Sequence, residues 1–320
     1  MKRIFVLLFI PGCCQFTQAQ DSSKTFTPYK FILPGSAIEC SMIPVNSGSF
    51  LFGSSDAEKN RGKDEGPQHK VNIPSFWMGA FEVSRDEFDV FYKDETTSEN
   101  SNVDAVTRPS PQYIDFSLGM GKEGGYPVNS LSQYAALMYC RWLYNKTGVF
   151  YRLPSEDEWE YACRAGSTTT YFFGNDETQL DKYAWYEGNS KSKFQKSGLK
   201  LPNAWGLYDM LGNVCEWTLD HYEEKRLANR QDSAGNIFVA PNKSRYPKAL
   251  RGGGFNDDAS ELRCANRFKS DPFWNRRDPQ IPKSKWWLTD APSVGFRIVR
   301  PFKQPNAEEV NLFFKLYLGK

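Results

Sequence analysis

Apolar residues that recur every three or four positions mark the helices of this chain. One such run begins after Ser132 and ends at Gly148, a residue type that commonly terminates helices. The pairs Ser84–Glu87 and Ser155–Glu158 have the spacing of reciprocal caps, in which the Ser and Glu side chains each bond a free backbone amide. The second pair opens a run that Gly166 stops. We therefore expect three capped helices.

Short apolar runs bounded by turn residues mark the strands. Residues 42–53 predict a hairpin that turns at Asn46-Ser47-Gly48. Residues 71–82 alternate well enough to form another pair of strands. Residues 249–251 predict a strand that leads into three glycines, and residues 295–300 predict a central strand that closes the domain.

No internal repeat or linker divides the chain. The polar stretches 96–110 and 220–247 are typical of surface insertions. We expect one domain over residues 40–301, preceded by a leader segment over residues 20–39 and followed by an amphipathic C-terminal tail over residues 302–320.

Residues 1–19 have the pattern of an export signal, with Lys2-Arg3, an apolar run and the cleavage site Thr17-Gln18-Ala19. A second interpretation is a bacterial lipoprotein box at Ile10-Pro11-Gly12-Cys13, which would place a lipid anchor on Cys13. A third is a buried N-terminal strand. The apolar run is shorter than the roughly 20 residues that span a bilayer. We expect an exported protein without a transmembrane span: periplasmic, outer-membrane-associated or secreted.

Composition narrows the class of protein. Forty Lys and Arg against 38 Asp and Glu leave a net charge of +2, which argues against a nucleic-acid partner. Aromatic residues make up 15% of the chain, and 24 Gly and 19 Pro accompany them, which favours a loop-rich fold over a helical bundle. Only His69 and His221 are present, so a three-histidine metal centre is excluded.

A series of motifs in a fixed order resembles the formylglycine-generating enzyme (sulfatase-modifying factor) family from Pro44 to Arg297. The strings are Pro44–Gly53, Asp64–Val71, Glu82–Ser84, Tyr126–Asn129, Arg152–Ala162, Pro202–Trp217, Arg251–Phe255, Arg263–Arg267 and Gly295–Arg297. The resemblance implies an α/β (α+β) domain with little regular secondary structure, in a fold related to the C-type lectin fold. It also implies oxidation of a sulfatase cysteine by oxygen and copper, the metal being held by two thiolates.

The copper thiols of the enzymes lie between the Gly-Gly turn and the Arg-Cys-Ala-x-Arg string. That interval, residues 254–262, contains no cysteine here, and Cys264 is the only cysteine after Cys215. Cu(I) needs soft sulfur ligands, so we expect no copper site. The sequence therefore predicts a member without formylglycine-generating activity that binds a peptide, a glycan or an envelope protein, as a binding or scaffold module. The alternative is an oxidoreductase that acts on a protein cysteine or another substrate through a replaced metal site.

The resemblance also assigns other residues. It implies a disulfide between Cys163 and Cys264. The usual partner of Cys140 is replaced by Ile298, so Cys140 is expected to be a core thiol. Cys215 is either a reactive thiol or a buried one, and we favour burial because no Lys or His adjoins it in sequence.

A structural calcium ion is implied at the Asn213 and Val214 oxygens and the Glu216 carboxylate, which are hard donors of the kind that Ca²⁺ prefers. His69 is expected to be structural. His221 has acidic neighbours that would raise its pKa, or else it is a solvated loop residue. The pair Asp257-Asp258 either binds a cation or is merely solvated.

Overall fold

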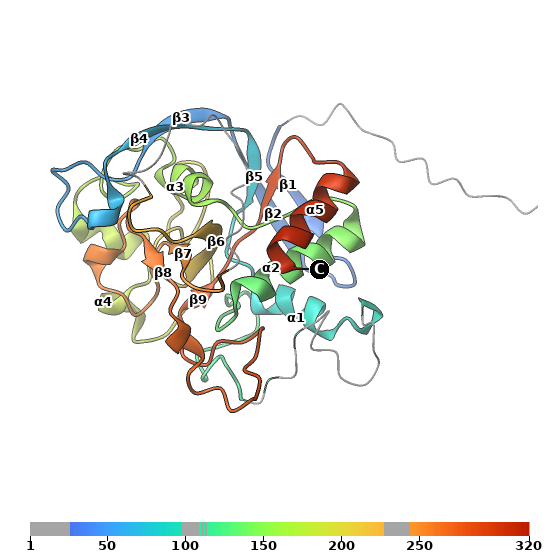
Figure 1. Ribbon diagram of the computed structural model, residues 1–320. Helices are drawn as coiled ribbons and strands as arrows, with labels where there is room; N and C mark the ends of the chain where they lie inside the picture. The colour runs from blue at the N-terminus through green and yellow to red at the C-terminus, as the bar shows by residue number, and fades with distance from the viewer. Residues whose placement is uncertain (1–25, 98–108, 110–111, 113, 227–243, 320) are drawn as a thin grey trace, which may run out of the picture.

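The computed structural model describes residues 26–97, 109, 112, 114–226 and 244–319 (Figure 1). The predicted signal segment and Cys13 lie outside these residues. Within the described ranges, no helix combines the length and the apolar character that a membrane span requires. Short helices and three small sheets alternate with long loops, as the high content of Gly, Pro and aromatic residues indicated.

Two sheets have four strands and one has two. The first has the order β1-β2-β5-β10 and is antiparallel, and the second pairs β3 with β4; the third has the order β8-β7-β6-β9, in which β6 and β9 are parallel. The strands are β1 (Tyr29–Ile32), β2 (Glu39–Val45), β3 (Gly48–Phe52), β4 (His69–Ile73), β5 (Phe76–Gly79), β6 (Cys215–His221), β7 (Lys248–Arg251), β8 (Phe268–Lys269), β9 (Val294–Gly295) and β10 (Val299–Pro301).

The hairpin predicted over residues 42–53 is wrong, although both of its strands exist. The strands β2 and β3 do not pair with each other; β2 pairs with β5, and β3 pairs with β4. The chain therefore runs on through Asn46 and Ser47 instead of turning back. Gly48 is needed for close packing and not for a turn, because a Cβ atom there would overlap the hydroxyl of Tyr161.

The helices predicted after Ser84, Ser132 and Ser155 begin directly after these residues. The helices are α1 (Arg85–Lys93), α2 (Gln133–Thr147), α3 (Glu156–Arg164), α4 (Glu187–Ser190) and α5 (Ala307–Leu318), with 3-10 segments at Lys63–Glu65, Glu95–Thr97, Glu177–Lys182, Ala259–Glu261 and Pro272–Asn275. The Ser155 hydroxyl accepts the amide of Glu158 at 3.2 Å, and Gly148 ends α2 with a φ of 68°. The last turn of α3 is closed by Ala165, one residue before Gly166. The three capped helices are confirmed.

The central strand predicted over residues 295–300 is also wrong. The segment is divided between β9 and β10, which are edge strands of different sheets. Between them, Arg297 is fully buried and donates hydrogen bonds to the carbonyl oxygens of Gly79 and Tyr208, at 3.1 and 2.9 Å. The guanidinium of Arg297, which lies between the two strands in sequence, therefore joins the end of β5 at Gly79 to the loop at Tyr208.

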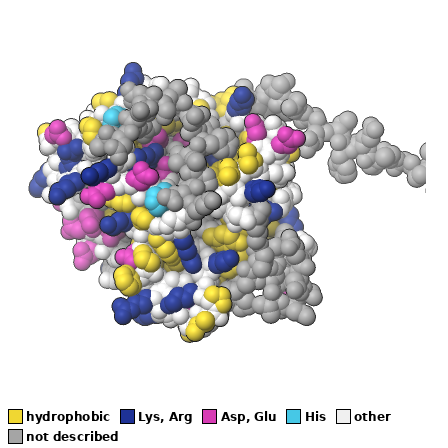
Figure 2. All heavy atoms as spheres, viewed as in Figure 1, with side chains coloured by type: hydrophobic (Ala, Val, Ile, Leu, Met, Phe, Trp, Pro, Cys, Tyr) yellow, Lys and Arg dark blue, Asp and Glu magenta, His cyan; other side chains and the backbone are white. Residues whose placement is uncertain are grey.

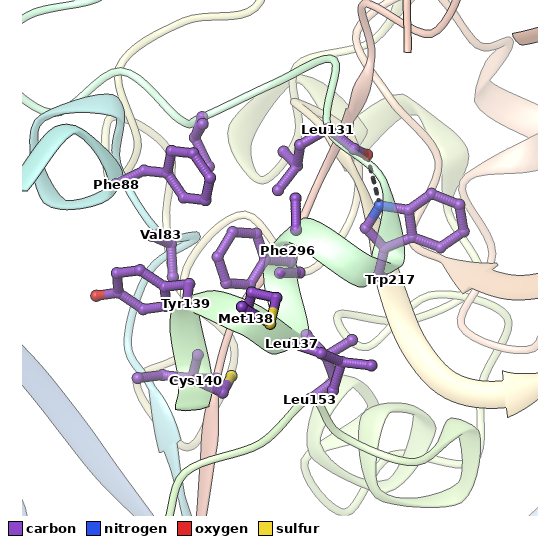
Figure 3. Close-up of a cluster of buried hydrophobic side chains, with 14 of the residues drawn as sticks. Val83, Phe88, Leu131, Leu137, Met138, Tyr139, Cys140, Leu153, Trp217 and Phe296 are labelled. Carbon is purple, nitrogen blue, oxygen red and sulfur yellow. Dashed lines mark hydrogen bonds between the residues drawn. The ribbon is translucent and has the colours of Figure 1, made fainter. Parts of the chain in front are cut away.

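Both ends of the described chain join the main core. β1 pairs with β2 across residue 39, so the predicted boundary between leader and domain cuts through a pair of strands. α5 packs on α2 and buries Val310, Phe313 and Phe314 (Figure 1). Figure 3 shows part of this core, in which α2 contributes Leu137, Met138 and Tyr139. The structural unit therefore extends beyond residues 40–301 on both sides.

Candidate functional site

The interval that lacks the copper thiols is a tight turn followed by one turn of 3-10 helix. The amide of Gly254 donates to the carboxylate of Asp257 at 2.7 Å, and Asp258 caps the 3-10 segment through the amide of Ser260. Burial, with the nearby Glu261 and Glu187 carboxylates, raises the pKa of Asp257 to about 6. Both acids therefore have local structural partners, and the interval presents oxygen donors in place of sulfur.

The cysteines of the described chain are buried and free: Cys40, Cys140, Cys163, Cys215 and Cys264. Burial raises the pKa of the Cys215 thiol well above its usual value, and its Sγ donates to the carbonyl of Arg251 at 3.4 Å. Burial raises the pKa of Cys140 and of Cys40 in the same way, and the Cys40 thiol points at the Glu87 carboxylate, 3.5 Å away.

Cys163 and Cys264 lie side by side, as the resemblance implied. Their sulfur atoms are 3.6 Å apart, with both side chains fully buried, and they connect α3 to the segment before β8. The two residues are thiols in this structure. The disulfide stays a prediction, with its partners already in contact.

Two of the three residues expected to bind calcium, Glu216 and Asn213, accept hydrogen bonds from other groups. Both carboxylate oxygens of Glu216 accept hydrogen bonds from Arg297, at 2.6 to 2.8 Å, and one also accepts the indole N–H of Trp159 at 2.7 Å. The carbonyl of Asn213 accepts the amide of Phe255 at 2.8 Å. These donors do not fit Ca²⁺ in this arrangement, because the ion takes six to eight oxygens and the Glu216 carboxylate would have to leave its buried partner. In the described ranges, no three His, Cys, Asp or Glu side chains are grouped to hold a metal.

Three buried carboxyl groups instead surround Arg297. Glu82 accepts the side-chain amide of Asn213 and the hydroxyl of Ser197, at 2.7 and 2.6 Å. Burial, followed by the charges of Asp209 and Glu216, raises the pKa of Glu82 well above its usual value. Burial also raises the pKa of Asp209 to about 6. One guanidinium thus faces three carboxyl groups in a buried site, and burial together with the neighbouring carboxylates raises the pKa of Glu82 and Asp209.

The sequence did not single out Glu82 or Asp209 as members of one site. Both belong to motif strings that were used only as evidence for the fold, and the strings are more than a hundred residues apart. The signal that could have found them is the acid that each string carries between apolar neighbours.

A second ionic network supports the turn before the interval. Arg251 is fully buried and binds the carboxylate of Glu160, whose other oxygen accepts Arg164 at 2.9 Å. Glu156 binds the guanidinium of Arg267 through two contacts of 2.9 Å. Although burial opposes ionisation, the arginines around Glu156 hold its pKa well below the usual range. This network is structural, because every charge in it is paired inside the protein.

The two histidines lie at strand ends. His69 begins β4 opposite Phe52. His221 ends β6 and is not in a loop. Burial and the Lys248 charge lower its pKa, and they outweigh the Glu223 carboxylate, which acts to raise it as expected.

Comparison with known proteins decides the family. The family model described as sulfatase-modifying factor enzyme 1-like domain matches residues 36–280. The chain belongs to this family. Formylglycine-generating enzyme of Bos taurus is 27% identical over 276 residues, which cover 72% of this chain and 71% of that protein. A second Bos taurus protein, inactive C-alpha-formylglycine-generating enzyme 2, is 24% identical over 229 residues, 59% of this chain and 73% of that one.

One further relative is much longer than this chain, and one solved structure is matched over nearly its whole length. Serine/threonine-protein kinase Pkn1 of Chlamydia trachomatis is 28% identical over 240 residues, which cover 72% of this chain but 36% of that protein. This chain therefore spans about a third of the chlamydial protein. The structure of PvdO from Pseudomonas aeruginosa aligns with a TM-score of 0.66 and 28% identity, over 86% of this chain and 98% of that one. The fold class expected from the sequence, a mixed α/β domain of the formylglycine-generating-enzyme type, is confirmed.

Proposed function

We propose that this chain is an exported member of the sulfatase-modifying factor family that does not generate formylglycine. It acts as a binding module, in an envelope scaffold or as a secreted domain, for a peptide, glycan or protein partner. The observation that carries the proposal is the interval 254–262, where Asp257 and a 3-10 turn stand in place of the two thiols that the resemblance implies. The Cys215 thiol is buried, and burial raises its pKa, which adds support.

The surface beside this interval suits a binding role. The rings of Tyr171, Phe173 and Tyr183 stack, with centroids 5.1 and 4.4 Å apart, and the hydroxyl of Tyr171 donates to the carbonyl of Ala259 within the interval. Phe173 and Tyr183 are half-buried, so part of each ring faces solvent. Figure 2 shows acidic side chains gathered on the left of the view, where Figure 1 places α4. Flat aromatic surfaces of this kind bind sugar rings and aromatic side chains.

Activity can be tested directly with Cu(I) and a sulfatase peptide. We expect the mass of the peptide cysteine to stay unchanged, with a copper-binding family enzyme assayed in parallel as the positive control. Conversion of that cysteine to the aldehyde would overturn the proposal and favour the oxidoreductase alternative. A Cys215→Ala variant would then show whether this thiol takes part.

Binding and export need separate tests. A glycan array and a peptide library can be screened with the native protein and with Tyr183→Ala, and we expect the variant to lose the ligands that the native protein retains. Export is tested by N-terminal sequencing of the mature protein, and the lipid anchor by the membrane retention of Cys13→Ala. Unprocessed protein in the cytoplasm would contradict the export proposal.

A further inference from the structure

A cleft of about 560 Å³ is lined by α1 and by described residues between 112 and 123. We call it the α1 cleft. Its volume lies within the range of roughly 300–1,000 Å³ that is usual for small-molecule sites. The ring of Tyr92 and the exposed side chain of Ile114 give it an apolar part, while the rest of the described lining is polar or charged. The cleft therefore suits a small organic molecule that carries polar groups.

Arg85 is a buried cation of this cleft that has no carboxylate partner in the described chain. It is 5% exposed, and its guanidinium makes one hydrogen bond there, from Nη2 to Asn129 Oδ1 at 3.1 Å. The guanidinium carbon also lies 5.9 Å from the centre of the Trp287 ring. Burial lowers the pKa of Arg85, although the charges of Asp89 and Asp115 act to raise it. A guanidinium has five N–H donors, so most of them are left for a ligand.

Gln112 brings a second unpaired donor to the same cleft. Its side-chain Nε2 is buried and has no hydrogen-bond partner in the described chain. Burying a donor without an acceptor costs free energy that a ligand can return, and the cost is larger for a charged group such as Arg85. Two such donors indicate a ligand that supplies acceptor oxygens. A carboxylate has two of them and matches the fork of a guanidinium.

The other charged groups of the cleft limit what else the ligand can carry. Asp89 and Asp115, the two acids that act on the guanidinium, lie 3.2 Å from Lys93 and 3.3 Å from Lys122. Glu123 is exposed and forms no ion pair within the described chain. The described lining thus has as many carboxylates as cations, and it has no net charge that would attract a simple anion. A molecule that carries both charges fits this lining better.

We propose that the α1 cleft binds a free α-amino acid, with its carboxylate on Arg85 and Gln112 and its ammonium group toward Glu123. The carboxylate gives the buried guanidinium the ionic partner that the described chain does not provide, and it accepts the unpaired amide donor. The ammonium group takes the carboxylate that has no cation of its own. Tyr92 and Ile114 remain for contact with the side chain of the ligand.

The probes are the twenty protein L-α-amino acids, each titrated alone into the full chain in a calorimeter. We expect at least one of them to bind at one site per molecule, with a Kd below about 1 mM. For that amino acid, the analogue without the amino group and the analogue without the carboxylate should each bind about tenfold more weakly or worse. If none of the twenty binds, or if the analogue without the amino group binds equally well, the proposal is wrong.

Variants of the cleft test the assigned contacts. Arg85→Lys keeps the charge but removes the fork, so it should weaken binding by about tenfold or more. Because Arg85 is buried, Gln112→Leu is the second variant: it removes a donor without a partner in the described chain, and should weaken binding without lowering the melting temperature. Glu123→Gln should reduce the preference for the amino acid over its analogue without the amino group. Glu308→Gln, an exposed acid of α5 outside the cleft, should leave the affinity unchanged.

Two results with these variants would overturn the proposal. One is unchanged affinity in both Arg85→Lys and Gln112→Leu, and the other is an equal loss in Glu308→Gln. A formylglycine product in the assay above would leave the inference standing, because the α1 cleft shares no described residue with the interval 254–262 and does not rest on the proposed function.

Discussion

Replacing Glu216 by glutamine tests whether this carboxylate serves an ion pair or a calcium ion. The carboxylate bonds Arg297 through three contacts in a fully buried site. Removing one partner of a buried ion pair costs about 3–5 kcal/mol, because the other charge stays buried without compensation. Glu82 and Asp209 remain near Arg297 and offset part of its charge, so we expect a loss of unfolding free energy near the lower end, about 3 kcal/mol.

The assay is urea unfolding of Glu216→Gln and the native protein, each in excess EDTA and in excess calcium. We expect the same loss in both solutions, because the ion pair does not involve the metal. Glu39→Gln, which removes an exposed carboxylate 2.6 Å from Lys30, is the matched control and should change stability by less than about 1 kcal/mol. If calcium stabilises only the native protein, or if Glu216→Gln costs less than about 1 kcal/mol, the ion-pair reasoning is refuted.

Three further predictions concern pH, packing and redox state. Asp209→Asn should stabilise the protein above about pH 7 by about 3 kcal/mol. The native carboxyl, with its pKa raised to about 6, binds its proton more tightly in the folded state, so its contribution is lost as the pH rises through 6 and the two proteins converge toward acid pH. Gly48→Ala should cost about 1–3 kcal/mol in thermal unfolding, and Tyr161→Phe should recover part of it by removing the overlapping hydroxyl. Exported protein should contain the Cys163–Cys264 disulfide. These two cysteines should then resist alkylation when the protein is unfolded without reductant. Cys163→Ser should lower the free energy of unfolding by about 4–5 kcal/mol.

Each of these has a result that would contradict it. For Asp209, a stability difference that grows toward acid pH would show that the carboxyl is ionised throughout. For Gly48, an alanine variant as stable as the native protein would show that β3 shifts at no cost. For the disulfide, alkylation of all five cysteines in the non-reduced, exported protein would show that the pair stays as thiols.

Local sequence signals predicted where the helices and strands lie better than they predicted which strands pair. The caps at Ser84 and Ser155 were right, because a capping box is complete within four residues of sequence. The strands on either side of Asn46 and Ser47 were right as strands and wrong as a hairpin, because each pairs with a strand further along the chain, β2 with β5 and β3 with β4. Residues 295–300 form one run in the sequence, yet its first residue belongs to the sheet of β9 and its last two belong to the sheet of β10.

The sequence by itself determined the family, the helix ends and the lack of cysteine in residues 254–262, since each depends on residue identity and short spacing. Only the tertiary structure decided which charges meet. Glu216 had the pattern of a calcium ligand, but the bend between β9 and β10 brings Arg297 against it, and a buried carboxylate is satisfied by the cation that reaches it.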